Sequence, residues 1–349
     1  MCGRAGRPRF DKYGEAILVA KNQEEKEMLL ENYLLGENEN IFSKLGTEPA
    51  IRSHVLALVA TKAAVSIDGL NDFFKRTFLA HQTEAIHLEG AIENVVEFLK
   101  REEMLHEEDG LRATLFGKMV SDLYIDPQSA VIIREALKKY VQGSTFGLLH
   151  AICATPDMPL LYLRQSDYQW IEDYLDERKS ELLIQPPDDL ARYEIFLSEV
   201  KTAKLLDDWL LEVHENDIAE SFGVGPGDIR NKTDIAEWLV HGAARLSDIF
   251  QNEAKKEAIE LRTRVRYGIR SELLDLVKLS GIGRVRARAL YDRGYRSIED
   301  LRNVTYDRLK QIPMIGEAVA RSIKQQLGQA ERGMTEGPEK EQTSLKDYR

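Results

Sequence analysis

Hydrophobic positions recur at helical spacing through most of this 349-residue chain. Between residues 48 and 123 the spacing predicts helices over 52–61, 67–78 and 88–100, followed by two short runs around a turn at 108–110. Three helices and a hairpin predict a winged helix. The third helix is so apolar that we expect this domain to act mainly as a structural bridge, and its predicted buried face consists of Leu88, Ile92, Val95, Val96 and Leu99.

Residues 129–251 consist almost entirely of amphipathic helical segments separated by proline and glycine turns, which predicts an all-α bundle. Asp228 follows the last of these turns, and we expect it to be the N-cap of the next helix. The final domain has two similar halves, in which the turns at 279–284 and 312–317 lead into helices over 285–291 and 318–327.

The beginning of the chain has a different pattern. An arginine-glycine loop at residues 3–8 precedes one short apolar run at 15–20, which predicts a strand. Because a strand needs partners to satisfy its backbone and bury its faces, we interpret this run as the last piece of a sheet domain.

Composition is ordinary for a globular protein, with 43% hydrophobic and 31% charged residues. No run of 18 apolar residues and no secretory signal pattern is present, so we expect a cytoplasmic protein with no membrane partner. Cys2 and Cys153 lie far apart, and the seven histidines are scattered. A disulfide framework, a zinc site or any other metal site is therefore not expected.

The charge is unevenly distributed, because the whole chain carries −11 while residues 262–324 hold 15 Lys and Arg against 7 Asp and Glu. That segment is thus +8 (15 − 7), and the remainder is −19 (−11 − 8). A basic module on an acidic body is typical of a protein whose local patch binds phosphates.

The turn at Gly281 and Gly283 supports this interpretation, since glycines permit a tight turn and the following helix start presents free N–H groups to an anion. Arg284, Arg286 and Arg288 add charge beside it, so we expect a DNA phosphate there. The second turn has Pro313 where the first has Gly281, and we expect it to serve mainly as scaffold. The paired turns resemble a tandem helix-hairpin-helix DNA-binding domain.

Gly3-Arg4-Ala5-Gly6-Arg7-Pro8 resembles the sixth signature motif of superfamily 2 helicases. The resemblance implies that Arg4 and Arg7 are arginine fingers, which reach the γ-phosphate of ATP bound between two RecA-like domains. The Gln that begins the family motif is absent. The order of the following domains, with Tyr124-Ile125-Asp126-Pro127, resembles the archaeal Hjm-type DNA repair helicases, which unwind branched DNA with 3′ to 5′ polarity.

We therefore expect a mainly α fold made of five parts. They are the C-terminal remnant of a second RecA-like domain (1–47), a winged helix (48–126), a helical ratchet domain (127–268), a tandem helix-hairpin-helix domain (269–328) and a disordered tail (329–349). The chain would be the DNA-binding part of an ATP-dependent helicase that acts on branched or fork DNA. The alternative is a stand-alone, non-enzymatic DNA-binding or adaptor protein.

The resemblance implies that a ratchet helix over 233–250 contacts single-stranded DNA. Trp238 is placed to stack on a base, while Arg230 and Arg245 are placed to hold phosphates. The competing interpretation is that Trp238 closes the edge of the bundle core.

No phosphate-binding Gly-x-x-x-x-Gly-Lys loop is present, so we expect ATP and Mg²⁺ to bind the intact helicase and neither to bind this chain alone. In the tail, Gln342, Leu345 and Tyr348 resemble a sliding-clamp binding motif. A sliding clamp is therefore a candidate partner, beside single-stranded and branched DNA.

Overall fold

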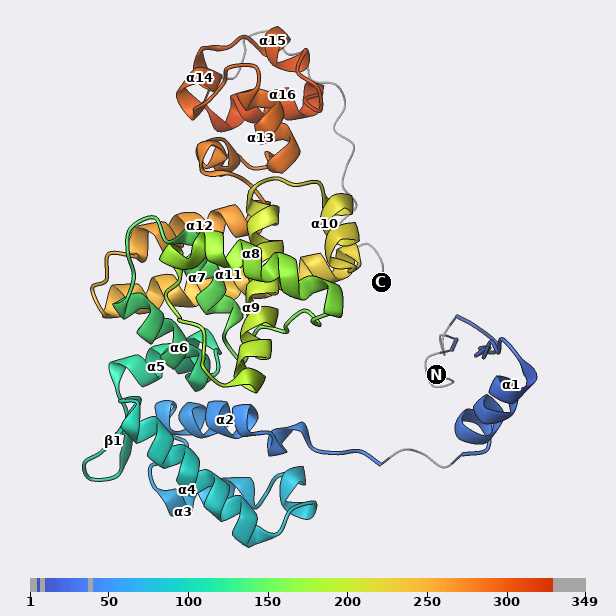
Figure 1. Cartoon of the computed structure of the whole chain (residues 1–349), viewed down its shortest axis with the longest axis vertical. Coiled ribbons are helices and arrows are strands. Elements are labelled where there is room, and N and C mark those ends of the chain that lie inside the picture. Colours follow the sequence, from blue (N-terminus) through green and yellow to red (C-terminus); the bar gives the residue numbers. More distant parts are fainter. Residues whose placement is uncertain (1–4, 7–9, 37–39, 329–349) are drawn as a thin grey trace. The chain divides into compact units, whose positions relative to one another are not determined.

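The computed structural model describes residues 5–6, 10–36 and 40–328. Contacts within the chain divide it into two compact units, residues 1–44 and 45–349, which are described separately. Figure 1 shows the helices and the single small sheet of the described residues. The expectation of a mainly α fold is confirmed.

Unit 1 contains one helix, α1 (Gln23–Leu29), which continues into a π-helical turn, η2 (Leu30–Leu34). Neither element has a buried residue, and Ile17 and Val19 are also exposed. The predicted strand at 15–20 does not form, which corrects the sequence-based assignment. Among the described residues of this unit, no other strand lies beside residues 15–20, so the segment cannot form the hydrogen bonds of a sheet.

Unit 2 begins with the predicted winged helix. Its elements are η3 (Lys44–Gly46), α2 (Glu48–Ala60), α3 (Ile67–Phe74), η4 (Phe78–His81), α4 (Ala85–Arg101), β1 (Leu105–Glu107), β2 (Leu111–Ala113) and α5 (Leu115–Leu123). The strands are antiparallel, with Leu105 opposite Ala113. The order of helices and wing is confirmed, and all five residues of the predicted apolar face are buried.

The helical bundle follows without a break in the core. Its elements are α6 (Pro127–Lys138), α7 (Thr145–Cys153), η5 (Gln165–Asp167), α8 (Tyr168–Arg178), η6 (Lys179–Glu181), α9 (Leu190–Leu210), α10 (Glu215–Phe222), α11 (Pro226–Ile249) and α12 (Lys255–Tyr267). One continuous set of buried apolar residues extends from Ile51 in α2 to Val265 in α12. Helix α11 is central, because it packs on α5 of the winged helix and on five helices of the bundle.

Helix α11 begins earlier than the sequence suggested. Its N-cap is Gly225, Pro226 occupies the first turn, and Asp228 lies three residues after the cap. The Asp228 carboxylate accepts a hydrogen bond from the Gly225 backbone N–H at 2.9 Å. Asp228 is thus the acidic partner of a capping box and not the N-cap, because proline favours the first helical position.

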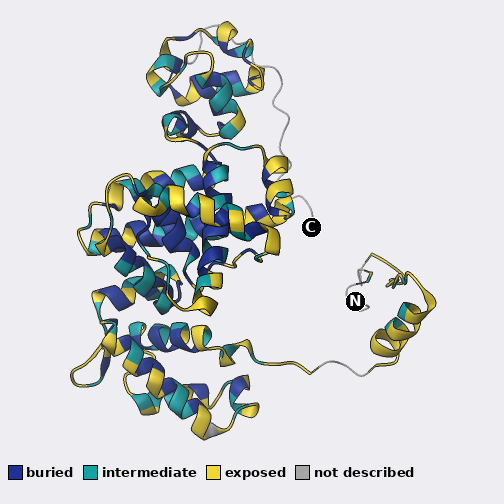
Figure 2. Cartoon of the chain, viewed as in Figure 1, coloured by how far each residue is buried: buried dark blue, intermediate teal, exposed yellow. Residues whose placement is uncertain are grey.

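The last domain has a core of its own, from Ile269 to Leu327. It consists of η7 (Ser271–Leu273), η8 (Leu276–Lys278), α13 (Arg284–Tyr291), α14 (Ile298–Asn303), α15 (Tyr306–Lys310) and α16 (Glu317–Gln326). Figure 2 shows buried residues facing inward in this domain and in the bundle, with exposed residues on the outer faces. Within the described ranges, no helix is long and apolar enough to cross a membrane.

A buried ion pair ties the winged helix to the bundle. Arg52 of α2 donates from Nε and Nη2 to the two carboxylate oxygens of Asp126, each at 3.0 Å. Asp126 is also the N-cap of α6, where it accepts from the Gln128 N–H at 2.9 Å, and its own N–H donates to Asp157 at 2.8 Å. The start of the bundle is therefore fixed to α2.

We predict that Arg52→Met lowers the free energy of unfolding by about 3 to 5 kcal/mol, because it leaves the Asp126 carboxylate buried without its counter-charge. Urea or thermal unfolding followed by circular dichroism measures the change. Arg101→Met is the matched control, since Arg101 is exposed beside Glu102 and its loss should cost no more than about 0.5 kcal/mol. Equal stability of both variants would contradict the assigned role of the Arg52 pair.

Candidate nucleic-acid interface

One flank of α11 carries Trp238 and Arg245, two of the side chains on which the DNA prediction depends, with His241 between them. Trp238, His241 and Arg245 are three and four residues apart, so they lie along the same side of the helix. Trp238 is half-buried, and its indole N–H donates to the carbonyl oxygen of Leu123 at 2.9 Å. Arg245 is exposed and, among the described residues, has no carboxylate within 4.0 Å. The flank thus combines a partly accessible ring with an unneutralised charge.

His241 is part of a cluster between α11 and α12. Its Nδ1 lies 3.2 Å from Nη1 of Arg262, whose Nε lies 3.5 Å from the Glu237 carboxylate. Burial lowers the pKa of His241, and the charges of Arg262 and Arg245 lower it further. The imidazole is therefore neutral at pH 7 and accepts the hydrogen bond from Arg262, so the positive charge of this flank belongs to the arginines.

Arg230 lies near the start of α11, two turns before Trp238. Its guanidinium forms an exposed ion pair with Asp234, with Nη2 at 2.9 Å from the carboxylate. An exposed pair of this kind is weak, so a phosphate can compete with Asp234 for the guanidinium.

The two turns of the last domain have the same backbone conformation. Gly281 has φ +80°, and Met314 has φ +67° in the second turn. Met314, and not Pro313, is therefore the counterpart of Gly281, which corrects the sequence alignment of the two turns. Apart from the chain neighbours of each glycine, no described residue has an atom within 4 Å of where a Cβ would be at Gly281, Gly283 or Gly316. Among the described residues, nothing therefore fills the space beside these three glycines.

The three arginines after the first turn have different surroundings. Arg284 packs over the Trp209 ring at 4.9 Å and donates to the Val213 carbonyl at 2.6 Å. Burial lowers the pKa of Arg284, although a guanidinium remains charged at neutral pH. Arg286 donates to the carbonyls of Gly281 and Met314, at 2.7 and 3.1 Å, and so links the two turns. Among the described residues, no carboxylate lies within 4.0 Å of Arg286.

Arg288 instead forms a joint between the bundle and the last domain. Its guanidinium donates to both carboxylate oxygens of Glu212, at 2.8 and 2.6 Å, and to Glu272 at 2.9 Å. Hydrogen bonding to Glu212 raises the pKa of Arg288. Burial alone would raise the pKa of Glu212, but the hydrogen bonds from Arg288 and the Arg270 N–H outweigh it and lower that pKa. The charge of Arg288 is thus neutralised within the chain.

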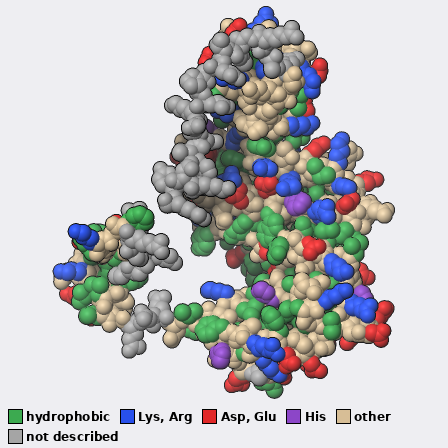
Figure 3. Space-filling view, turned by 180° about the vertical axis from the view of Figure 1, so that it is seen from behind, with side chains coloured by type: hydrophobic (Ala, Val, Ile, Leu, Met, Phe, Trp, Pro, Cys, Tyr) green, Lys and Arg blue, Asp and Glu red, His purple; other side chains and the backbone are tan. Residues whose placement is uncertain are grey.

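The wing carries a basic group that the sequence analysis did not identify. A hollow of about 540 Å³ lies between the end of α2, the two strands and α5, and Asp109 is the acidic residue at its edge. In the part of the chain that the structure describes, four basic side chains at this hollow form no ion pair, namely Lys62, His106, Arg112 and Lys118. In Figure 3, Lys and Arg side chains gather on the side of the winged helix that bears the wing. The first and last of these residues, Lys62 and Lys118, are 56 positions apart in the sequence, so no local sequence pattern indicates the group.

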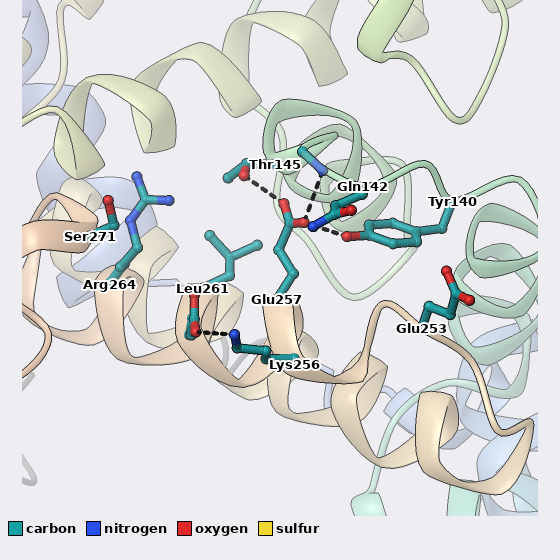
Figure 4. A pocket seen from close by; sticks show the side chains of 11 residues that line it. Tyr140, Gln142, Thr145, Glu253, Lys256, Glu257, Leu261, Arg264 and Ser271 are labelled. Carbon is teal, nitrogen blue, oxygen red and sulfur yellow. Dashed lines mark hydrogen bonds and ion pairs between the residues drawn. The ribbon is translucent and has the colours of Figure 1, made fainter.

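A second hollow, of about 480 Å³, lies between α12 and the loop that joins α6 to α7. Figure 4 shows the Glu257 carboxylate of α12 pointing toward Tyr140 and Thr145. Glu257 accepts hydrogen bonds from Tyr140, from Thr145 at 2.6 Å and from the Gly143 N–H at 3.2 Å. Burial and the contact with Glu257 raise the pKa of Tyr140 to about 12. The carboxylate therefore holds the start of α7 in place, and no predicted site residue lines this hollow.

The arginine-finger candidates Arg4 and Arg7 and the tail residues Gln342, Leu345 and Tyr348 lie outside the described residues. Nearby, Gly14 packs so closely on the Ala5 backbone that a Cβ would lie 2.3 Å from its carbonyl carbon. Only glycine fits at that contact. Across the described ranges, no group of three or more His, Cys, Asp or Glu residues is arranged to hold a metal ion.

Three family models match successive parts of the chain. "Helix-turn-helix domain" matches residues 14–106, "Archaeal helicase, domain 4" matches residues 146–268, and "SAM-like Helix-hairpin-helix tandem" matches residues 273–329.

Similar curated proteins cover nearly the whole chain. The ATP-dependent DNA helicase Hel308 of Methanocella arvoryzae is 48% identical over 336 residues, which are 94% of this chain and 45% of that protein. The proteins of the same name from Thermococcus kodakarensis and Pyrococcus abyssi are 38% and 36% identical, over 100% and 97% of this chain and 32% and 48% of their own lengths. The chain thus spans less than half the length of these relatives. Nearly the whole chain is thus similar to a part of the archaeal DNA helicases named Hel308, as expected for the C-terminal part of a superfamily 2 helicase.

Proposed function

We propose that the chain is the DNA-gripping portion of an ATP-dependent helicase that unwinds branched or fork DNA with 3′ to 5′ polarity in repair and replication restart. The observation that carries the proposal is the match of almost the entire chain to relatives named ATP-dependent DNA helicases. The exposed flank of α11 and the open turns of the last domain supply surfaces of the right chemistry.

In this proposal, the last domain holds the sugar-phosphate backbone through the turns before α13 and α16. Free N–H groups at a helix start attract an anion, and the space in front of both turns is open. Arg286 is the residue best placed to assist, because it lies between the turns and no carboxylate of the described residues neutralises it. Arg284 and Arg288 act mainly on the orientation of the domain, through Trp209 and Glu212.

The flank of α11 is proposed to contact single-stranded DNA. Trp238 offers the accessible part of its ring to a base, and Arg245 and Arg230 hold phosphates on either side along the helix. The hydrogen bond to Leu123 fixes the Trp238 ring, which lowers the entropy lost when a base stacks on it. Core packing and base stacking are therefore compatible roles for this residue.

ATP and Mg²⁺ are proposed to act in the intact helicase only. Arg4 and Arg7 would stabilise charge on the γ-phosphate, while the phosphate loop and the metal ligands would come from segments that are not in this chain. The chain alone is expected to bind DNA without nucleotide.

We predict that Arg286→Ala weakens binding to all DNA sequences and reduces the slope of log K against log salt by about 0.7 to 0.9, because one phosphate contact is lost. Fluorescence anisotropy titrations at several salt concentrations measure both values. Arg302→Ala, which removes an exposed arginine already paired with Glu299, is the control and should change the slope less. Identical slopes for the parent and Arg286→Ala would exclude a phosphate contact at this residue.

We predict that Trp238→Ala costs about 1 to 3 kcal/mol of binding to single-stranded DNA and leaves the salt slope nearly unchanged, because stacking releases few counterions. The control is Trp170→Ala, which removes another half-buried tryptophan, hydrogen-bonded to Asp167, from the bundle. Melting curves show whether each variant is folded. If Trp238→Ala lowers only the melting temperature and not the DNA affinity, the residue is part of the core alone.

The tail is proposed to bind a sliding clamp through Gln342, Leu345 and Tyr348. We predict that a peptide of residues 342–349 binds an archaeal clamp and that replacing Leu345 and Tyr348 together by Ala abolishes binding, since these side chains would fill its apolar pocket. Isothermal titration calorimetry measures the interaction, and a peptide of the same composition in scrambled order is the control. Equal binding of the double variant would show that the motif is a coincidence.

A further inference from the structure

Tyr124, which joins the winged helix to the bundle, has an unusual backbone and an unusual exposure. It terminates α5 with φ 57° and ψ 25°, in the left-handed region that bulky residues seldom adopt. Its side chain is 88% exposed, the highest value among the exposed large apolar or aromatic residues of the described chain. The fold therefore keeps a strained tyrosine at a position where no contact with the described core requires its ring.

The residues on either side of Tyr124 are held firmly. The Leu123 carbonyl accepts the indole N–H of Trp238, and Ile125 is buried against Gly242 of α11. Asp126 is fixed by the ion pair with Arg52. The backbone that carries the Tyr124 side chain is therefore fixed, while the side chain itself is in solvent.

We propose that Tyr124 is a stacking platform for a base of single-stranded DNA, next to the base that contacts Trp238. This inference rests on the proposed function, because it requires the strand to follow the flank of α11. The Leu123 carbonyl that accepts the Trp238 indole N–H belongs to the peptide bond of Tyr124, so the Tyr124 backbone lies next to the Trp238 ring.

The physical chemistry favours a base over the apolar face of a protein partner. Trp238 is half-buried and offers only part of its ring, whereas Tyr124 offers nearly all of it. A rigid aromatic ring loses little conformational entropy on binding and accepts any base, which suits contacts that do not depend on sequence. A protein interface would need a continuous exposed apolar patch, yet the chain neighbours of Tyr124 are half-buried Leu123 and buried Ile125, so its ring is the exposed aromatic group of this segment.

The test uses two substitutions that separate the ring from the backbone. Tyr124→Asn removes the ring but suits the left-handed conformation, so the fold should be kept, while Tyr124→Phe retains the ring. The probes are a fluorescein-labelled 15-residue oligothymidylate and an abasic oligonucleotide of the same length, which has the phosphates but no bases. Tyr13→Asn, at an exposed tyrosine of unit 1, is the matched control.

We expect Tyr124→Asn to bind the oligothymidylate about 5- to 150-fold more weakly than the parent, the range for loss of one stacked base. On the abasic probe it should match the parent, and Tyr124→Phe and Tyr13→Asn should match the parent on both probes. Unchanged affinity of Tyr124→Asn for the oligothymidylate, or an equal loss on both probes, would overturn the inference.

The result also distinguishes this inference from the proposed function. If Tyr124→Asn binds like the parent while Trp238→Ala and Arg286→Ala are weakened, the proposed DNA surface remains and Tyr124 is not part of it. If the parent chain itself fails to bind the oligothymidylate, the proposed function fails together with the inference.

Discussion

The buried ion pair between Asp126 and Arg52 is the interaction on which the arrangement of the winged helix and the bundle depends. The Asp126 carboxylate accepts two hydrogen bonds from Arg52 and one from the first turn of α6, while the backbone N–H of the same residue is held by Asp157. A buried carboxylate is stable only with such compensation, since its desolvation costs several kcal/mol. Three residues earlier in the chain, the Leu123 carbonyl accepts the indole N–H of Trp238, which places the Tyr124 backbone next to that ring.

The last domain shows why a net local charge is an incomplete guide to a phosphate site. Its basic excess is real, but Arg288 is neutralised by Glu212 and Glu272, and Arg284 packs on Trp209. Arg286 instead links the two turns and has no carboxylate within 4.0 Å among the described residues. The arginines therefore divide into two that contact the bundle and one that has no carboxylate partner among the described residues, and charge alone does not separate the two groups.

In unit 1 and at the wing, exposed apolar and basic side chains have no packing or ion-pair partner among the described residues. The helix α1 buries none of its residues, and the short apolar run at 15–20 forms no strand. At the wing, Lys62, Arg112 and Lys118 have no acidic partner within ion-pair distance among the described residues. Apolar and basic surfaces of this kind fit a chain that spans less than half the length of its relatives.

The sequence by itself determined the helical domains and their order, because helical periodicity and glycine or proline turns are local signals. It located the buried face of α4, the two similar turns of the last domain and the relation to superfamily 2 helicases. It misplaced the start of α11, the counterpart of Gly281 and the strand at 15–20. Each of these errors concerned a backbone conformation that depends on neighbouring groups or on a partner strand.

Only the tertiary structure decided which candidate side chains are available to a ligand. Arg284, Arg286 and Arg288 are equivalent in sequence, yet contacts with residues more than 70 positions away separate Arg284 and Arg288 from Arg286. The position of the Tyr124 backbone next to Trp238 likewise depends on a hydrogen bond between Leu123 and a residue 115 positions later. Such contacts between distant segments form only when the chain folds, and no local pattern of residues encodes them.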